Sequence, residues 1–389
     1  MVPGSPPHLR WEAEALWQQL VPLLPHISVE VLARCESTNS TLIERARQAG
    51  GDPDAPVTLP GELEPARENG APGGIGTTPY GRRGGDTDPC LLVAEQQTRG
   101  RGRLGRSWLA APGASLTFSL VLPLAPRDWS GLSLAVGLAL ADALDPSGAR
   151  PEAAAPRIAL KWPNDLWLLP PAEGDADSAA AAPQAQPAQP AQSAQPAQPT
   201  LPALPAGGAK LGGILVETVS VGRRRLCVVG VGLNVQPLPL TLAVELGAGH
   251  ACMQALDPQA TAPGVLARVA MPLVRALLAF EREGFAPLAA HYAARDLLRG
   301  REVTTTLAHA AGGVAEGVDE FGALLLRAAG QRHRIVSGEV SVRRAPVDAP
   351  APAAPEPAPP QAPERAPRPA SEDAPRPASE DAPRPARGG

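Results

Sequence analysis

The alternation of arginine and glycine at residues 97–108 is the stretch of the chain best suited to chemistry. It reads Gln-Thr-Arg-Gly-Arg-Gly-Arg-Leu-Gly-Arg-Ser-Trp. Glycine lets backbone N–H groups come close to a ligand, and arginine offers forked donors that match carboxylate and phosphate. The segment is too short to be anything but a loop, and no Gly-Lys-Ser/Thr follows as in a Walker A loop. We expect this Gly-Arg loop to close over an anion, although a solvated basic face or a nucleic-acid contact has the same composition.

Four further motifs accompany the loop in a fixed order. One precedes it and three follow it: Ser37-Thr38-Asn39, Lys161-Trp162-Pro163-Asn164-Asp165, Lys210-Leu211-Gly212-Gly213-Ile214-Leu215-Val216-Glu217 and Gly230-Val231-Gly232-Leu233-Asn234. The first motif stands before a helical run, so it is read both as a helix N-cap and as a ligand site. A lysine at the start of an apolar strand is either a solubilising charge or a site cation, and the glycine pair after Lys210 favours the cation.

Taken together, these motifs resemble those of the biotin–protein ligases, over about residues 27–343 with gaps. The resemblance implies an ATP-dependent ligase that activates biotin as biotinyl-5'-AMP, releases pyrophosphate, and transfers biotin to a lysine of a biotin carboxyl carrier protein or domain. It implies ATP and Mg²⁺ as cofactors and biotin as substrate. The implied fold is α+β: a mixed sheet with helices packed on it, as in class II synthetases, plus a small C-terminal SH3-like barrel.

The chemistry of acyl activation explains why such a site needs cations, because a carboxylate and an α-phosphate must meet despite their repulsion. Arg103 and Lys210 are the expected catalytic cations, and the resemblance assigns Lys210 to the biotin carboxylate. Asp165 is expected to hold Mg²⁺, which prefers oxygen ligands. The residues expected to bind biotin are Ser37, Thr38, Asn39, Gln97, Gly100, Arg101, Arg103, Lys210, Gly213, Gly230 and Gly232. Those expected to bind ATP are Arg101, Arg103, Arg106, Trp108, Lys161, Asn164 and Asn234.

Hydrophobic periodicity predicts the elements that position these residues. Strands are predicted at 27–32, 91–96, 116–122, 158–162, 166–169, 210–218 and 226–234. Helices are predicted at 11–24, 41–48, 132–144, 264–284 and 286–298. From residue 300 the pattern changes to short strands separated by glycine turns, at 302–307, 313–318, 323–328, 334–336 and 339–342. This last pattern predicts a small all-β barrel.

Composition divides the chain of 389 residues, because more than half of its 48 prolines fall in 50–89, 170–208 and 345–389. Such segments bury too little apolar surface to order themselves. The predicted organisation is, in chain order, an N-terminal extension (1–26), a biotin/ATP-binding catalytic domain (27–297) with disordered insertions at 50–89 and 170–208, an SH3-like domain (298–344) and a disordered Pro/Ala-rich tail (345–389). The second insertion is expected in a hairpin, where loop-closure entropy grows slowly with length.

Charge and cysteine usage narrow the function classes. The net charge of −4 gives no global basic field for nucleic acid, and the four cysteines form no Cys-x-x-Cys pair. No apolar run approaches the roughly 20 residues that span a bilayer, so we expect a cytoplasmic monomer or homodimer without membrane contact. The residues before the first predicted strand are too few for a three-helix DNA-binding module, so we expect no nucleic-acid partner. Two alternatives stay open: a lipoate-type acyl-adenylating ligase on the same fold, and a nucleic-acid-binding regulator that uses the arginine-rich loop.

Overall fold

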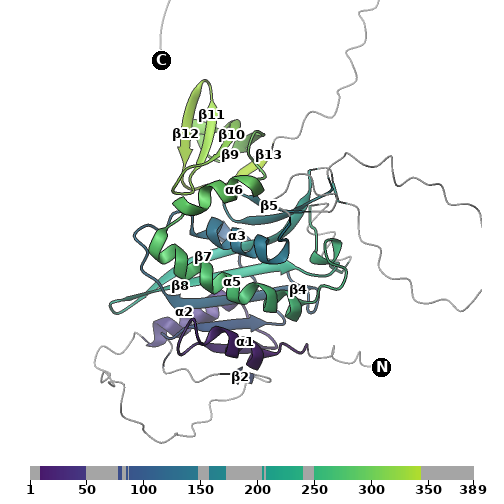
Figure 1. Cartoon of the computed structure of the whole chain (residues 1–389), viewed down its shortest axis with the longest axis vertical. Coiled ribbons are helices and arrows are strands. Elements are labelled where there is room, and N and C mark those ends of the chain that lie inside the picture. The colour runs from purple at the N-terminus through teal and green to yellow at the C-terminus, as the bar shows by residue number, and fades with distance from the viewer. Residues whose placement is uncertain are drawn as a thin grey trace, which may run out of the picture. The chain divides into compact units, whose positions relative to one another are not determined.

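The structure is a computed structural model, and it describes residues 9–49, 78–80, 85, 87–147, 157–171, 204–205, 207–239 and 249–342. These residues belong to one compact unit. They form a large sheet with helices on both faces and a smaller sheet near the C-terminus (Figure 1). A mixed α/β core with a small β domain is the predicted fold class, which is thereby confirmed. The predicted domain boundaries stay predictions.

The large sheet has eight strands in the order β2-β1-β3-β4-β8-β7-β6-β5. In chain order they are β1 Ser28–Leu32, β2 Thr78–Tyr80, β3 Cys90–Ala94, β4 Ser115–Pro123, β5 Arg157–Lys161, β6 Asp165–Leu169, β7 Ala209–Val221 and β8 Arg224–Asn234. Strands β1 and β3 pair in parallel, and the other neighbours pair antiparallel. The sheet is therefore mixed, and β6 and β7 form the predicted hairpin.

Helices cover the two faces of this sheet unequally. The helices are α1 Ala13–Leu20, α2 Thr38–Ala49, α3 Leu132–Leu144, α5 Ala262–Glu283 and α6 Ala289–Arg295. Strand side chains alternate between faces. Val228 of β8 packs in one cluster with α2, whereas its neighbours Cys227 and Val229 pack in the main core with α3 and α5. Helix α2 thus lies alone opposite the larger helical layer, at the face where the Ser-Thr-Asn motif begins.

Helix α5 is 22 residues long and, by length and composition, could cross a membrane. The expectation that no apolar run approaches that length is therefore wrong for α5. One side of the helix contributes nine buried residues, from Ala262 to Phe280, to the main core. The other side carries charged residues such as Arg268 and Arg275. This two-sided pattern is that of a helix packed on a sheet.

The C-terminal sheet has the order β12-β11-β10-β9-β13 and is antiparallel throughout. Its strands are β9 Glu302–Thr305, β10 Gly312–Val318, β11 Leu324–Ala328, β12 Gln331–Ile335 and β13 Val340–Val342. It is consistent with the predicted small barrel. The turn at Gly322 has a positive φ of 77° and packs so tightly that a Cβ there would lie 2.7 Å from Gly131 Cα. Beside it, Trp162 Nε1 donates to Gly322 O at 3.0 Å, which ties the small sheet to the Lys-Trp-Pro-Asn-Asp motif.

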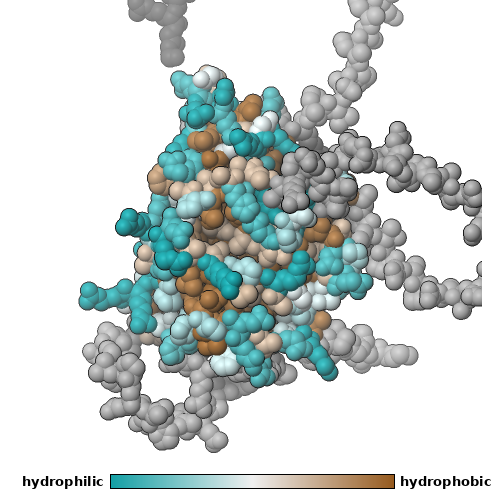
Figure 2. All heavy atoms as spheres, in the orientation of Figure 1, coloured by the Kyte–Doolittle hydropathy of each residue, from teal (hydrophilic) through white to brown (hydrophobic). Residues whose placement is uncertain are grey.

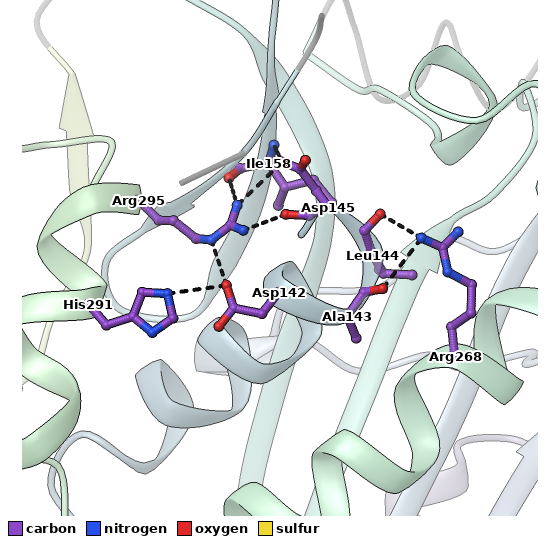
Figure 3. A network of polar contacts seen from close by, with 8 residues as sticks. All are labelled: Asp142, Ala143, Leu144, Asp145, Ile158, Arg268, His291 and Arg295. Carbon is purple, nitrogen blue, oxygen red and sulfur yellow. Dashed lines mark hydrogen bonds and ion pairs between the residues drawn. The ribbon is translucent and has the colours of Figure 1, made fainter. Parts of the chain in front are cut away.

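The C-terminal end of α3 is fastened by Arg295 of α6, whose side chain is fully buried (Figure 3). Its Nε donates to Asp142 Oδ1 at 2.9 Å, and its Nη1 donates to Ile158 O at 2.9 Å. Its guanidinium also contacts the carboxylate and the carbonyl oxygen of Asp145. Arg268 donates to the Leu144 carbonyl at 2.7 Å. The carbonyls that a helix end leaves without intrahelical donors are thereby satisfied.

Further sequence predictions need correction. Helix α2 begins at Thr38, three residues earlier than predicted, with Ser37 at its start. The predicted helix 286–298 is a 3-10 turn followed by α6, which ends at Arg295 because the next residues turn to the sheet, where Leu297 N donates to Leu160 O. The segment 50–89 contains strand β2, which pairs with β1. The rest of that insertion, most of 170–208 and the tail lie outside the described residues.

Candidate active site

A cavity of roughly 750 Å³, measured out to its mouth, lies under the Gly-Arg loop, at the ends of β7 and β8 near the start of α2. Fourteen of the residues predicted for the site line it: Ser37, Thr38, Asn39, Gln97, Arg101, Arg103, Arg106, Trp108, Asn164, Asp165, Lys210, Gly213, Gly230 and Gly232. They come from five separate motifs. The fold therefore brings the motifs together at one place, as their fixed order suggested.

The Gly-Arg loop is a narrow hairpin held by its own backbone. Trp108 N donates to Gly100 O at 2.8 Å, and Gly102 N donates to Arg106 O at 2.7 Å. A Cβ on Gly100 would lie 2.3 Å from Trp108 O, so only glycine allows this approach. Gly100 does not line the cavity. It shapes the loop, and its predicted contact with biotin has no direct support from its position.

Hydrogen bonds pre-set the polar end of the cavity, where α2 starts. Thr38 N donates to Gln97 Oε1 at 2.7 Å, and this hydrogen bond fixes the orientation of the Gln97 amide. Asn39 Nδ2 donates to Leu215 O at 3.2 Å and to Glu217 Oε2 at 2.9 Å. A Cβ on Gly230 would lie 2.2 Å from Asn39 Oδ1. The glycine at 230 therefore makes room for Asn39, in addition to lining the cavity.

The middle of the cavity is apolar and is closed by Trp108. A Cβ on Gly232 would lie 2.4 Å from the indole ring, so this glycine is what lets the ring lie on β8. Phe118 and Val231 complete the lining there, and both are buried. The indole Nε1 of Trp108 is buried and has no hydrogen-bond partner among the residues that the structure describes. A buried donor without a partner costs free energy, so the ring is poised for an acceptor that a ligand supplies.

The cationic end is formed by Lys210 and Arg103. Lys210 Nζ lies 2.7 Å from Asp165 Oδ1 and 5.9 Å from the centroid of the Trp108 ring. Arg103 Nη1 lies 3.5 Å from Asn164 Oδ1. Burial lowers the pKa of Arg103, whereas the charge of Asp165 opposes that shift. A guanidinium partly stripped of water and without a close carboxylate is a strong binder of anions.

The other two loop arginines in the lining are already paired. Arg101 forms an ion pair at 2.9 Å with Glu217 of β7 and donates to Ser40 Oγ at 3.2 Å. Arg106 pairs with Glu339, which the C-terminal sheet contributes to the cavity. Both arginines hold the loop in place from opposite sides. Their expected ligand contacts require these ion pairs to open or to be shared.

Two predicted ATP contacts lie outside the lining of this cavity. Lys161 packs with its Nζ 5.1 Å from the centroid of the Trp167 ring, and burial is the largest cause that lowers the pKa of Lys161. Asn234 is buried, and its Nδ2 donates to Ala251 O at 3.1 Å. Within the described part of the chain, Asn234 Oδ1 has no hydrogen-bond partner. Both residues border the site without facing its open volume.

Sequence reasoning missed three residues that shape the site. Glu217 was part of a quoted motif but received no role. Ser119 is a buried hydroxyl that bonds to Thr38 and Asn39, and its signal was a polar residue inside the apolar strand β4. Glu339 left no signal, because its contact depends on how the C-terminal sheet meets the loop.

Comparison with known proteins places these motifs in one family. Residues 86–234 match the biotin/lipoate A/B protein ligase family, and residues 299–343 match the biotin protein ligase C-terminal domain. The chain is 32% identical to the biotin–[acetyl-CoA-carboxylase] ligase of Mycobacterium tuberculosis, over 66% of this chain and 80% of that protein. It is 29% identical to the bifunctional ligase/repressor BirA of Escherichia coli, over 66% of this chain and 67% of that protein.

A solved structure supports the same fold. The biotin protein ligase from Aquifex aeolicus, in complex with biotin and ATP, is 22% identical and superimposes with a TM-score of 0.51. The match covers 82% of this chain and 99% of that one. At this level of identity the likeness speaks for the fold, and the site must be argued from its own residues.

Proposed function

Because this chain belongs to the biotin–protein ligase family, we propose that it activates biotin as biotinyl-5'-AMP and transfers it to a lysine of a biotin carboxyl carrier protein or domain. The observation that carries the proposal is the division of one cavity into a polar end, an apolar middle and a cationic end. Biotin has the same three parts in the same order: a ureido edge, an apolar bicycle with its chain, and a carboxylate.

The polar end suits a cyclic urea. Gln97 Oε1 accepts from Thr38 N, so the Gln97 amide nitrogen is left to donate to a ligand carbonyl. The hydroxyl of Thr38 is available to the neighbouring ligand N–H. A dithiolane ring, as in lipoate, offers neither group and would cover these polar atoms without giving them partners, which is unfavourable. This end of the cavity favours biotin over lipoate.

The cationic end suits the first half-reaction. A carboxylate oxygen of biotin attacks the α-phosphorus of ATP, the new P–O bond forms the mixed anhydride, and pyrophosphate leaves with the electron pair. Lys210 and Arg103 face the place where the two anions meet, so both offset their repulsion and the charge that builds up on phosphorus. The indole of Trp108 covers this region and limits access of water to the anhydride.

The residues at the cationic end of the cavity also fit Mg²⁺ that is bound to the phosphates of ATP. Among the described residues, no group of three or more His, Cys, Asp or Glu side chains is arranged to hold a metal ion. Mg²⁺ that travels with ATP needs only one or two carboxylates, because phosphates and water complete its shell. Asp165 is the carboxylate beside Lys210 in the cavity, and it would hold the ion. When bound, Mg²⁺ neutralises phosphate charge and assists departure of pyrophosphate.

In the second half-reaction the acceptor lysine, as a neutral amine, attacks the carbonyl carbon of the anhydride. The amide bond forms, AMP leaves with the electrons of the broken C–O bond, and the amine proton is released to water. Arg103 lines the cavity, and in this proposal it retains the adenylate until the acceptor arrives. ATP and newly made carboxylase domains coexist in the cytoplasm, so we propose that the ligase works there.

A nucleic-acid regulator is the less suitable function for the Gly-Arg loop. Arg101 and Arg106 are held by Glu217 and Glu339, so their charges are compensated within the protein. Phosphate-backbone binding needs several free cations on one surface. The loop directs Arg103 inward, to the cavity, and not to a nucleic-acid surface.

The proposal is tested by biotin-dependent exchange of labelled pyrophosphate into ATP, followed by mass measurement of an acceptor domain after incubation with biotin and MgATP. We expect exchange with biotin, none with lipoate, and one added biotin mass per acceptor domain. An acceptor in which the target lysine is replaced by arginine is the control for non-specific labelling. Exchange that depends on lipoate, or no exchange with either acid, would contradict the proposed function.

A further inference from the structure

The amide of Asn39 has one orientation that its surroundings allow. Its Nδ2 lies 3.2 Å from Leu215 O and 2.9 Å from Glu217 Oε2, and both of these oxygens only accept hydrogen bonds. A flipped amide would place an oxygen against two oxygens. Asn39 Oδ1 therefore faces Ser119, at 2.6 Å from Ser119 Oγ, and it needs a donor there. Asn39 is 3% exposed, so water is poorly placed to replace either partner.

The hydroxyl of Ser119 has two oxygen neighbours but only one proton. Ser119 Oγ lies 2.6 Å from Asn39 Oδ1 and also 2.6 Å from Thr38 Oγ1. Because Asn39 Oδ1 has no proton to give, the Ser119 proton goes to Asn39. The short contact between the two hydroxyls is then a hydrogen bond only if Thr38 donates to Ser119. The fully buried position of Ser119 excludes a solvent partner.

The proton of Thr38 is thereby directed into the protein. Among the described residues, the alternative acceptor at this end is Gln97 Oε1, at 3.2 Å, which also points the proton away from the open volume. In both arrangements Thr38 Oγ1 presents lone pairs to the cavity. A ligand atom that meets Thr38 must then bring its own hydrogen.

We propose that Ser119 and Asn39, anchored at Glu217, are positioning residues that keep Thr38 a hydrogen-bond acceptor, and that this relay selects a ligand N–H at the polar end of the cavity. The inference rests on the proposed function, because biotin supplies the N–H. It gives Asn39 a different role from direct contact with biotin. It also explains why a serine interrupts the apolar strand β4, and why position 230 must stay small beside Asn39 Oδ1.

The test compares biotin with its two cyclic carbamate analogues, in each of which one ureido N–H is replaced by a ring oxygen. Binding of each compound is measured by calorimetry to the unaltered full chain. An analogue that sets its ring oxygen against the Thr38 lone pairs loses a hydrogen bond and gains a repulsion, so we expect at least one analogue to bind about 100-fold more weakly than biotin. Equal binding of biotin and both analogues overturns the relay.

Ser119→Ala is the decisive variant, and Thr117→Val is its matched control. Thr117 is two residues earlier on β4, on the same face of the strand, and its buried hydroxyl donates to Ala94 O outside the relay. In Ser119→Ala the Thr38 proton loses the 2.6 Å contact with Ser119 and keeps only the 3.2 Å contact with Gln97 Oε1, which already accepts from Thr38 N. This weaker hold lets the proton turn toward the analogue's ring oxygen. We expect the preference for biotin over that analogue to fall from about 100-fold to about tenfold, and to stay unchanged in Thr117→Val.

The possible outcomes separate the relay from the proposed function. If Ser119→Ala keeps the full preference, or if Thr117→Val loses as much of it, the relay is overturned although biotin still binds. If the unaltered chain binds no biotin, the proposed function is overturned and the relay with it. A general loss of packing in Ser119→Ala would weaken all three compounds equally and leave their ratio unchanged, which also counts against the relay. If Ser119→Ala does not fold, the binding of biotin and both analogues to the unaltered chain still tests the relay.

Discussion

Two groups of arginines in this molecule differ in whether protein groups pair with their guanidinium. Arg295 is fully buried, and its guanidinium donates to the carboxylates of Asp142 and Asp145 at the end of α3 and to the carbonyl oxygens of Asp145 and Ile158 (Figure 3). On the Gly-Arg loop, Arg103 is half-buried, lines the cavity and forms no ion pair with a carboxylate among the described residues. An arginine whose donors are bound to other parts of the protein fixes the geometry of the protein. An arginine that is partly desolvated but incompletely paired holds its binding energy for a ligand.

The loop itself contains both kinds. Arg101 and Arg106 are tied to Glu217 and Glu339, and these ties hold Arg103 between them. Figure 2 shows the exposed surface of one face as a mixture of teal and brown patches. The hydropathy of the surface does not separate the paired arginines from Arg103, whereas the ion pairs of Arg101 and Arg106 do.

The largest effect is expected at the structural end of the comparison, from Arg295→Met. Removing one partner of a buried ion pair leaves Asp142 and Asp145 without their counter-charge, which costs about 3–5 kcal/mol of the free energy of unfolding. Arg268→Met is the control, because Arg268 binds the same helix end with a side chain 38% exposed, and it should cost about 1 kcal/mol or less. Urea unfolding measures both. Equal losses would remove the distinction between a buried and an exposed arginine at this place.

Lys210→Ala tests a cation that is held for the ligand and not for stability. We expect synthesis of the adenylate to fall about a thousandfold, because the two anions then meet without the ammonium. Transfer from preformed biotinyl-5'-AMP should fall less than about tenfold, since the carboxylate charge has gone by then. Separate assays of the two half-reactions decide this. Lys161→Met is the control, because Lys161 lies outside the cavity lining, and it should affect synthesis much less. If Lys210→Ala slows both half-reactions equally, Lys210 is only a binding contact.

Asp296, next to Arg295 in sequence, extends the comparison of buried charges from arginines to a carboxylate. Burial raises its pKa from 3.8 to about 6, and no described residue forms a hydrogen bond with its Oδ2. The folded protein holds this proton more tightly than the unfolded chain, so stability is lost as the pH rises from about 4 to about 6, by up to about 3 kcal/mol. Asp296→Asn keeps the acceptor for Leu298 N and removes the charge. Unfolding at pH 4 and pH 7 should therefore find the variant more stable than the parent at pH 7 alone.

Arg103→Ala should have the smallest effect, an approximately tenfold faster release of the adenylate with little change in stability. Released adenylate labels nearby lysines, so non-specific biotinylation of a bystander protein measures it. Arg99→Ala is the control on the same loop, because Arg99 is exposed and does not line the cavity. Unchanged release in Arg103→Ala would place Arg103 outside the working site.

The sequence predicted the elements whose signal is local. Helix α3 has the predicted bounds, because an apolar run of helix formers between two turns leaves little choice. The long strands β4, β7 and β8 extend one to three residues beyond their predicted ends. Strand β2 was missed because it is three residues long and follows a proline-rich stretch, and its pairing with β1 comes from the tertiary structure.

The site was predictable to the extent that motif residues face one cavity. Lys161 and Asp165 belong to one motif and pair across a tight turn, yet Lys161 turns to Trp167 while Asp165 turns to Lys210. No periodicity in five residues distinguishes these directions. Partners such as Glu339 lie far away in sequence, and only the packing of the C-terminal sheet brings them to the loop.

The β6–β7 hairpin has a consequence for dissecting the enzyme into two pieces. Leu168 of β6 pairs directly with Ala209 of β7, so the chain enters and leaves segment 170–208 at neighbouring points of the sheet. A cut inside that segment divides Asp165 from Lys210 and leaves neither fragment with a complete cavity. Two fragments fused to interacting partners would regain the cavity only when the partners meet. Covalent biotinylation of an acceptor would then report, after the partners have separated, that they had met.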